Sequence, residues 1–129
     1  MIVGIGTDIC RVARMGGAFD RHGERLLQRL LADDERDDCL RHADRARFLA
    51  KRFAAKEAFA KALGTGVRGI VRLKDIEVTH DAAGKPLLRF HGELSAWLRA
   101  RDWLAHVSVS DEQEHALAFV VIEARTEKQ

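Results

Sequence analysis

The sequence predicts an α+β fold, one domain over residues 1–129, in which a long central helix packs on an antiparallel sheet. The stretch from Asp44 to Leu63 contains no Gly or Pro and is rich in Ala, Leu, Lys and Arg, which favour helix. Short alternating apolar runs at both ends of the chain are typical of strands. A chain of 129 residues is long enough for one domain with a real core but too short for two.

The predicted central helix is apolar on two faces. At about 3.6 residues per turn, its apolar side chains fall into two stripes. The first stripe contains Ala46, Leu49, Ala50, Phe53 and Ala60, and the second contains Phe48, Ala55, Phe59 and Leu63. A helix with two apolar faces has to be covered on both, so we expect other elements to pack around it.

Glu57 interrupts the first stripe, because it lies between Phe53 and Ala60 on the same side of the helix. A carboxylate in that position loses water and needs a cation or hydrogen-bond donors in return. Lys61, one turn later, can supply the cation. On an exposed helix the same Glu–Lys spacing is only a surface pair worth about 0.2–0.5 kcal/mol. The helix alone leaves both interpretations open.

The first predicted strand, Ile2–Ile9, has two unequal faces. Alternation places Val3, Ile5, Thr7 and Ile9 on one face and Gly4, Gly6 and Asp8 on the other. Glycine weakens a strand unless another segment must approach its backbone closely, so we expect the second face to be covered. Asp8 is either a turn or helix cap before Arg11 or, together with Glu57, a ligand of a shared divalent cation.

Residues 11–31 are predicted to form an interrupted helix. Each of its three glycines, Gly16, Gly17 and Gly23, costs roughly 1 kcal/mol relative to Ala in a helix interior. The side chains that share one face are Arg14, Ala18, Arg21 and Arg25. This cationic face suits an acidic partner helix or nucleic acid phosphates, or it is simply exposed to water.

The segment Gly64–Gly69 matches the letters of G-x-G-x-x-G. The dinucleotide-binding fingerprint needs a strand before it and a helix after it. Here a helix precedes the glycines, so we reject a Rossmann fold. We expect a helix stop and a loop whose backbone N–H groups either meet a phosphate or only connect two elements.

The remaining elements are shorter. They are a helix capped by Asp33 and ending near Arg41, strands over Asp75–Thr79 and Leu87–Phe90, a helix over Glu93–Arg101 and a hairpin of Leu104–Ser110 with His115–Glu123. In the first hairpin strand, His106, Ser108 and Ser110 point to one face. Three hydrogen-bonding groups in a row either line a site or meet water.

Composition narrows the class of protein. The composition, with 47% hydrophobic and 33% charged residues, is typical of a soluble globular protein. It has no apolar run of membrane-spanning length and no signal peptide pattern, so we expect a cytoplasmic protein. Cys10 and Cys39 are far apart and are expected to be reduced and packed. Basic blocks at 11–29 and 41–56 flank an acidic block at 33–38, and most of the 22 basic residues are Arg, which suits carboxylate or phosphate binding.

Five motifs occur together in order along nearly the whole chain. They are Gly6-Thr7-Asp8, the run KEAFAKALGTG at residues 56–66, Asp75-Ile76-Glu77-Val78, Gly84-Lys85-Pro86 and His106-Val107-Ser108-Val109-Ser110. Each motif alone is weak, but the ordered set resembles the holo-[acyl-carrier-protein] synthases, the small bacterial 4'-phosphopantetheinyl transferases. The sequence departs from that pattern at Ala32, where many relatives carry Thr, at Asp111, where many carry His, and at the Gly16-Gly17 pair.

The resemblance implies an activity and its participants. The reaction is transfer of 4'-phosphopantetheine from coenzyme A to a serine of apo acyl carrier protein, with release of adenosine 3',5'-bisphosphate, in support of fatty acid biosynthesis. Asp8 and Glu57 would hold Mg²⁺, and Lys61 would face the phosphates or the leaving group. Family members assemble as trimers with sites between subunits. The expected coenzyme A contacts are Arg52, Gly64, Thr65, Gly66, Lys85 and His106, and the expected contacts to an acidic carrier protein are Arg14, Arg21 and Arg25.

The residue types fit that chemistry on their own terms. Mg²⁺ commonly takes one or two carboxylates, keeps several waters and completes its shell with phosphate oxygens. Glu57, or a water that it orients, can take the serine proton, and Lys61 can neutralise the leaving phosphate. Two other classes remain open: a basic module that binds nucleic acid or an acidic protein, and a structural subunit in which a Glu57–Lys61 pair locks helix packing.

Overall fold

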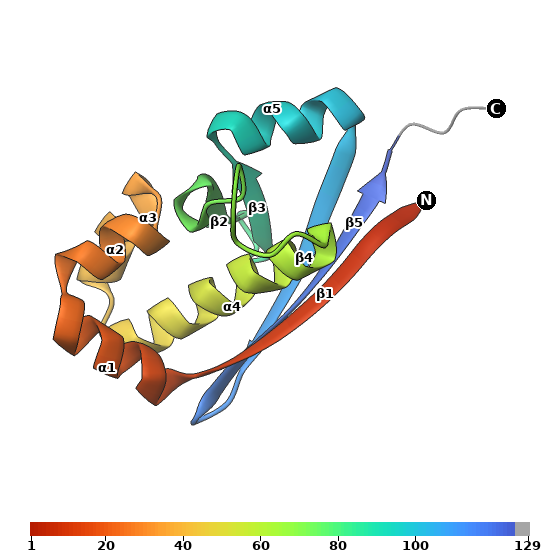
Figure 1. Ribbon diagram of the computed structural model, residues 1–129. Coiled ribbons are helices and arrows are strands. Elements are labelled where there is room, and N and C mark those ends of the chain that lie inside the picture. The colour runs from red at the N-terminus through yellow and green to blue at the C-terminus, as the bar shows by residue number, and fades with distance from the viewer. Residues whose placement is uncertain (126–129) are drawn as a thin grey trace.

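A computed structural model of the protein describes residues 1–125 and has the predicted central helix lying across an antiparallel sheet (Figure 1). The strands are β1 (Ile2–Arg11), β2 (Ile76–His80), β3 (Pro86–Phe90), β4 (Trp103–Asp111) and β5 (His115–Ala124). The helices are α1 (Val12–His22), α2 (Glu24–Leu30), α3 (Asp33–Arg41), α4 (Arg45–Leu63), the short 3-10 helix η1 (Leu73–Asp75) and α5 (Gly92–Arg101). Within these residues no helix is both long and apolar enough to cross a membrane.

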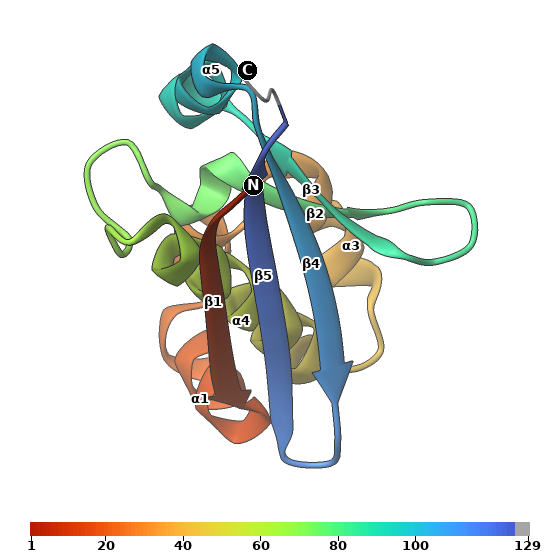
Figure 2. The same ribbon diagram turned by 90° about the vertical axis from the view of Figure 1, so that its right-hand side faces the viewer.

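The main sheet has the strand order β1-β5-β4, and all its neighbours are antiparallel (Figure 2). β2 and β3 form a separate antiparallel pair. The chain therefore starts at one edge of the main sheet, and its last two strands form the centre and the other edge. The inner face of the main sheet packs against α4, which is buried along most of its length, as its two apolar stripes predict.

Two glycines let α4 lie directly on the backbone of β1. A Cβ atom added at Gly4 would stand 1.9 Å from the carbonyl oxygen of Ala62, and one at Gly6 would stand 2.2 Å from that of Ala58. No side chain fits in such a space. The predicted reason for glycine in this strand is confirmed, and the next inward position after Gly6 is Asp8, which is thereby held against the same helix.

The opposite face of the main sheet is exposed, and its part on β1 and β5 is apolar. Ile5 and Ile9 of β1 and Leu117 and Phe119 of β5 each keep between 44% and 61% of their surface accessible. The register pairs Ile9 with Leu117, so these side chains form one continuous patch. A contiguous apolar surface of this kind is typical of an interface.

Of two local predictions, the first is confirmed in part, because the helix is interrupted as expected, and the second is wrong. The first concerns residues 11–31, where α1 ends and α2 begins at Gly23, which has a positive φ of 54°, while Gly16 and Gly17 lie inside α1. The common helical face predicted from Arg14 to Arg25 is therefore broken at Gly23. The second concerns the α3 cap: Ala32 is the N-cap residue, and Asp33 is already helical.

The α3 N-terminus keeps half of a capping box through Glu35. The Oε1 atom of Glu35 accepts a hydrogen bond from the Ala32 N–H at 2.9 Å, although Ala32 has no side-chain oxygen to return one. The Glu35 side chain also points into the core, where only 1% of its surface remains accessible. The acidic run that looked like a solvated surface therefore contains one internal carboxylate.

Candidate active site

Asp8 and Lys61 meet on the side of α4 that faces β1. The Lys61 Nζ atom donates to the Asp8 Oδ1 atom at 3.0 Å and to the Thr7 carbonyl oxygen at 3.1 Å. The Asp8 side chain is 15% exposed and the Lys61 side chain 54% exposed, so the pair lies at the rim of the packed interface. The expected Glu57–Lys61 ion pair does not form within the described residues, because the ammonium reaches across to the strand instead.

Glu57 lies in the electrostatic field of this pair. Partial burial, and then the negative charge of Asp8, raise the pKa of the Glu57 carboxyl group above its ordinary value, while Lys61 and Arg14 act in the opposite direction. Glu57 has no hydrogen bond or ion pair within residues 1–125. A partly desolvated carboxylate repelled by a second carboxylate is stabilised by an added cation or by a proton.

The donor set fits a magnesium ion better than a metal that needs a full protein cage. Asp8 and Glu57 offer hard oxygen ligands from a strand and a helix. In the part of the chain that the structure describes, no group of three or more His, Cys, Asp or Glu side chains is positioned to hold a metal. Mg²⁺ commonly takes one or two carboxylates and leaves the rest of its shell to water and phosphate oxygens.

A basic cavity of about 540 Å³ lies on another side of α4. Its cationic lining comprises Arg41, Arg47, Lys51 and Arg52, with His42 and His80 beside them. Phe48, which also lines the cavity, precedes Glu57 by nine residues, or about two and a half helical turns. The cavity and Glu57 therefore face opposite sides of the same helix, toward the β4 edge and the β1 edge respectively.

The Arg52 side chain is largely engaged inside the protein. Its guanidinium group donates to Glu35 at 3.1 Å and to the Val78 carbonyl oxygen at 2.8 Å, and it lies 4.3 Å from the centre of the Phe48 ring. Arg52 reaches the basic cavity with the 8% of its surface that is not buried. Its expected contact with coenzyme A thus stays a prediction for a residue that already has an internal role.

The other expected coenzyme A contacts are scattered. The Gly64 and Gly66 N–H groups donate to carbonyl oxygens of the last turn of α4, so these two donors cap the helix and do not point to a phosphate. Lys85 is exposed in the β2–β3 turn next to Gly84, which lines the basic cavity. His106 lies on the exposed face of β4, where its Nε2 atom is 2.5 Å from Glu123.

Thr65 is the last of the expected coenzyme A contacts. Its hydroxyl donates a hydrogen bond to the carbonyl oxygen of the next residue, Gly66, at 3.0 Å. Of the three arginines expected to contact a carrier protein, Arg14 lies next to the carboxylates: its guanidinium carbon is 5.2 Å from the centre of the Phe53 ring, one turn before Glu57. Arg21 is exposed on α1, and Arg25 is exposed on α2.

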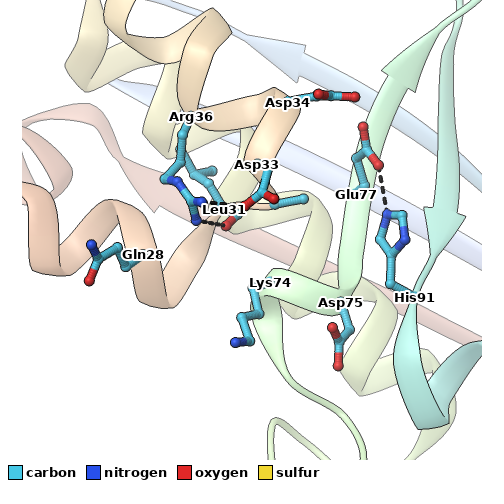
Figure 3. A pocket seen from close by; sticks show the side chains of 10 residues that line it. Gln28, Leu31, Asp33, Asp34, Arg36, Lys74, Asp75, Glu77 and His91 are labelled. Atoms are coloured by element: carbon cyan, nitrogen blue, oxygen red, sulfur yellow. Dashed lines mark hydrogen bonds and ion pairs between the residues drawn. The ribbon is translucent and has the colours of Figure 1, made fainter.

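Another cavity, of about 650 Å³, contains none of the predicted site residues (Figure 3). It lies between the start of α3 and the β2–β3 pair. Its two buried carboxylates already have partners within the described residues: Glu77 bonds to His91 at 2.7 Å, and Asp75 pairs with Arg72 at 3.3 Å. The candidate site is therefore the one at β1 and α4.

Sequence reasoning missed Lys56 and Glu35. The Lys56 ammonium is fully buried and donates to the Glu35 Oε1 atom at 2.6 Å, to the Leu30 carbonyl oxygen at 2.6 Å and to the Leu73 carbonyl oxygen at 3.0 Å. The motif at residues 56–66 was recognised, and Glu57, Lys61 and residues 64–66 were given roles, but Lys56 was given none. The available signal was the position of Lys56 between two apolar stripes, where no helical surface was left for it.

Comparison with known proteins identifies the class as the phosphopantetheinyl transferases. The chain belongs to the 4'-phosphopantetheinyl transferase superfamily, whose family model matches residues 4–120. The particular relatives are holo-[acyl-carrier-protein] synthases. That of Laribacter hongkongensis is 59% identical over 124 residues, covering 95% of this chain and 99% of the relative. That of Dechloromonas aromatica is 55% identical over 123 residues, covering 95% and 98%.

Solved structures agree with this assignment. The crystal structure of the holo-[acyl-carrier-protein] synthase from Neisseria meningitidis matches with a TM-score of 0.90 and 44% identity, covering 95% of this chain and 99% of that one. The Bacillus anthracis synthase, solved in complex with CoA (3',5'-ADP), matches with a TM-score of 0.81 and 37% identity, covering 96% and 98%. The predicted family, enzyme class and α+β fold are confirmed.

Proposed function

We propose that this protein transfers the 4'-phosphopantetheine group of coenzyme A to a serine hydroxyl of apo acyl carrier protein, with Mg²⁺ bound by Asp8 and Glu57. The observation that carries the proposal is the meeting of these two carboxylates and Lys61 at the α4–β1 contact. The relatives named above are synthases of this kind, and the Bacillus anthracis and Helicobacter pylori structures are complexes with CoA (3',5'-ADP) and with coenzyme A. The holo carrier protein that results serves fatty acid biosynthesis.

In this reaction the serine oxygen forms a bond to the phosphorus that carries the pantetheine arm. The bond from that phosphorus to the bridging oxygen breaks, and adenosine 3',5'-bisphosphate leaves with the electron pair. Bound Mg²⁺ would withdraw charge from the diphosphate and orient it. Glu57, whose pKa is raised by burial and by Asp8, would take the serine proton directly or through a water.

Lys61 has two roles in this proposal. Without ligand, its ammonium neutralises Asp8 at 3.0 Å. With its side chain 54% exposed, it can turn to the phosphate that leaves, where charge develops in the transition state. Asp8 would then exchange the lysine for the metal ion, so this carboxylate keeps a cationic partner in both states.

We infer that the working enzyme is a homotrimer with sites between subunits. The exposed apolar face of β1 and β5 supports association. The carboxylates lie at the β1 edge, whereas the basic cavity, which suits the phosphates of coenzyme A, lies toward the β4 edge of the same chain. Because α4 lies between them, the carboxylates and the basic cavity of one chain cannot form one site. The carboxylates of one subunit and the basic cavity of its neighbour can.

The carrier protein is proposed to dock on α1 and α2. Arg14 lies near Glu57, and Arg25 and Arg29 rim a cavity of about 340 Å³ whose other side chains are mostly apolar. A cationic rim around an apolar floor suits an acidic helix with an apolar side chain at its centre. Arg14, Arg21 and Arg25 keep their expected role in this proposal.

The test is to mix the protein with coenzyme A, Mg²⁺ and apo acyl carrier protein and to measure the intact mass of the carrier. We expect a gain of one phosphopantetheine group that depends on Mg²⁺ and on the carrier's serine. Absence of any gain with several apo carriers would contradict the proposed activity.

A further inference from the structure

A second cavity adjoins the docking cavity described above and extends it away from the carboxylates. This α2–loop cavity, of about 370 Å³, lies between α2 and the segment that connects α4 with η1. It is lined by Gln28, Arg29, Val67, Arg68, Gly69, Val71, Arg72, Leu73 and Lys74. Arg29 and Leu73 line both cavities, so the two hollows form one continuous surface across α2.

The lining of the α2–loop cavity carries four cations and no carboxylate. Of these cations, only Arg72 has an acidic partner within residues 1–125, Asp75 at 3.3 Å. Arg29, Arg68 and Lys74 are exposed and have no ion pair in that part of the chain. The surface therefore holds positive charge that nothing internal neutralises.

The loop that presents Arg68 has a defined, hydrogen-bonded backbone conformation. The Val71 N–H donates to the Arg68 carbonyl oxygen at 3.0 Å, and Gly69 between them has a positive φ of 61°, which only glycine adopts at little cost. Val71 is 2% exposed and anchors the turn in the core. Arg68 is thus held at the rim of the cavity by a fixed backbone turn.

We propose that the α2–loop cavity is a second docking surface for the acidic carrier protein, engaging carboxylates outside the segment that meets α1. This inference rests on the proposed function. Its basis is charge complementarity together with continuity: a protein seated on the apolar cavity at Phe53, one turn from Glu57, extends over Arg29 onto Arg68. With one contact at α1 and a second at the α2–loop cavity, the carrier cannot rotate on the surface. Its serine is then held facing Asp8 and Glu57.

The experiment compares Arg68→Glu with Arg99→Glu, which changes the net charge equally on α5, at an exposed residue outside both cavities. Steady-state transfer is measured at several salt concentrations with apo carrier protein as the varied substrate. Arg68→Glu is expected to raise the KM for the carrier by about 3- to 10-fold, with kcat and the KM for coenzyme A unchanged, and to reduce the salt dependence of kcat/KM. Arg99→Glu is expected to behave as the wild type.

Equal kinetics for the two variants would overturn the second docking surface while leaving the proposed function intact, because the wild type still transfers the group. A wild type that modifies no carrier would instead remove the proposed function, and this inference with it. Inorganic phosphate and a short DNA duplex serve as further probes in a direct binding assay. If Arg68→Glu weakens binding of either probe but not of the carrier, the cavity is an anion or nucleic acid site and the proposal is wrong.

Discussion

Lys56 and Glu57 are neighbours in the chain, yet they belong to two charge clusters with opposite properties. Lys56 and Glu35 are buried, and both ends of that pair have a full set of hydrogen bonds. Glu57 and Asp8, on the other side of α4, are partly exposed and repel each other, and the exposed Lys61 pairs with Asp8 alone. The first cluster has no free ligand position, whereas the second is stabilised by a cation from outside.

The difference shows how one helix can serve both stability and chemistry. Burial lowers the pKa of Lys56 to about 8, against the attraction of Glu35, so the ammonium is still charged at neutral pH. Its three acceptors come from α3, from the end of α2 and from η1, so it fixes these elements to α4. The adjacent residue, Glu57, then projects from a helix that cannot rotate.

The largest expected effect is on the buried cluster. Lys56→Met leaves the Glu35 charge buried with only Arg52 beside it, which we expect to lower the free energy of unfolding by about 3–5 kcal/mol. Urea unfolding followed by circular dichroism measures this change. The control is Lys51→Met, which removes an ion pair to Asp111 at 3.7 Å from a partly exposed side chain and is expected to change stability by less than about 1 kcal/mol. Equal losses of unfolding free energy in the two variants would contradict a special stabilising role for the buried Lys56–Glu35 pair.

The opposite result is expected at the exposed cluster. Asp8→Asn and Glu57→Gln should each reduce transfer by at least about 100-fold, because a metal ligand and a charge-stabilising group are lost. Neither should lower stability much, since each removes one of two carboxylates that repel each other. Intact-mass kinetics and thermal unfolding with and without Mg²⁺ give the two readouts. Glu93→Gln on α5, exposed and distant in the fold, is the matched control.

A smaller effect is expected at the contact of β1 with α4, which holds Asp8 beside Glu57. Gly6→Ala places a Cβ 2.2 Å from the Ala58 carbonyl oxygen, so the helix has to move away from Asp8, at a stability cost of about 1–3 kcal/mol. Transfer should fall as well, because Lys61 is displaced. In Gly17→Ala the new Cβ meets only the flexible end of Arg21 at 3.3 Å, and the change should be neutral or stabilising. Unfolding midpoints of both variants check this ordering.

The sequence predicted what depends on local pattern. The Gly4-Gly6-Asp8 face required a close neighbour, and the two apolar stripes of residues 44–63 required a helix covered on both sides; both follow from periodicity alone. Residue pattern offered a cation shared by Asp8 and Glu57 only as one alternative, and the family resemblance was needed to favour it, because the three helices α1, α2 and α3 separate β1 from α4 in the chain.

What could not be predicted depends on which partner meets which charge in three dimensions. Lys61 forms its ion pair with Asp8 and not with Glu57, although the four-residue spacing on the helix favours a pair with Glu57. Glu35 lies in a run of acids and differs from its neighbours only in pointing inward. Arg52 looked available for a phosphate until Glu35 was found beside it. A one-dimensional pattern identifies the charged residues but not their partners.

The smallest expected effect is a pH dependence confined to the exposed cluster. Because the pKa of Glu57 is raised in the folded state, the native protein binds a proton there more readily than the unfolded chain does. This contribution favours folding at low pH and is lost as the pH rises through the raised pKa, above the ordinary value of 4.5. Glu57→Gln should therefore be as stable as the wild type near pH 4 and slightly more stable at pH 7. Saturating Mg²⁺ should reverse the order at pH 7, because only the wild type keeps both carboxylates to bind it. A pH-independent difference between the two proteins, unaffected by Mg²⁺, would show that Asp8 and Glu57 do not form one electrostatic unit.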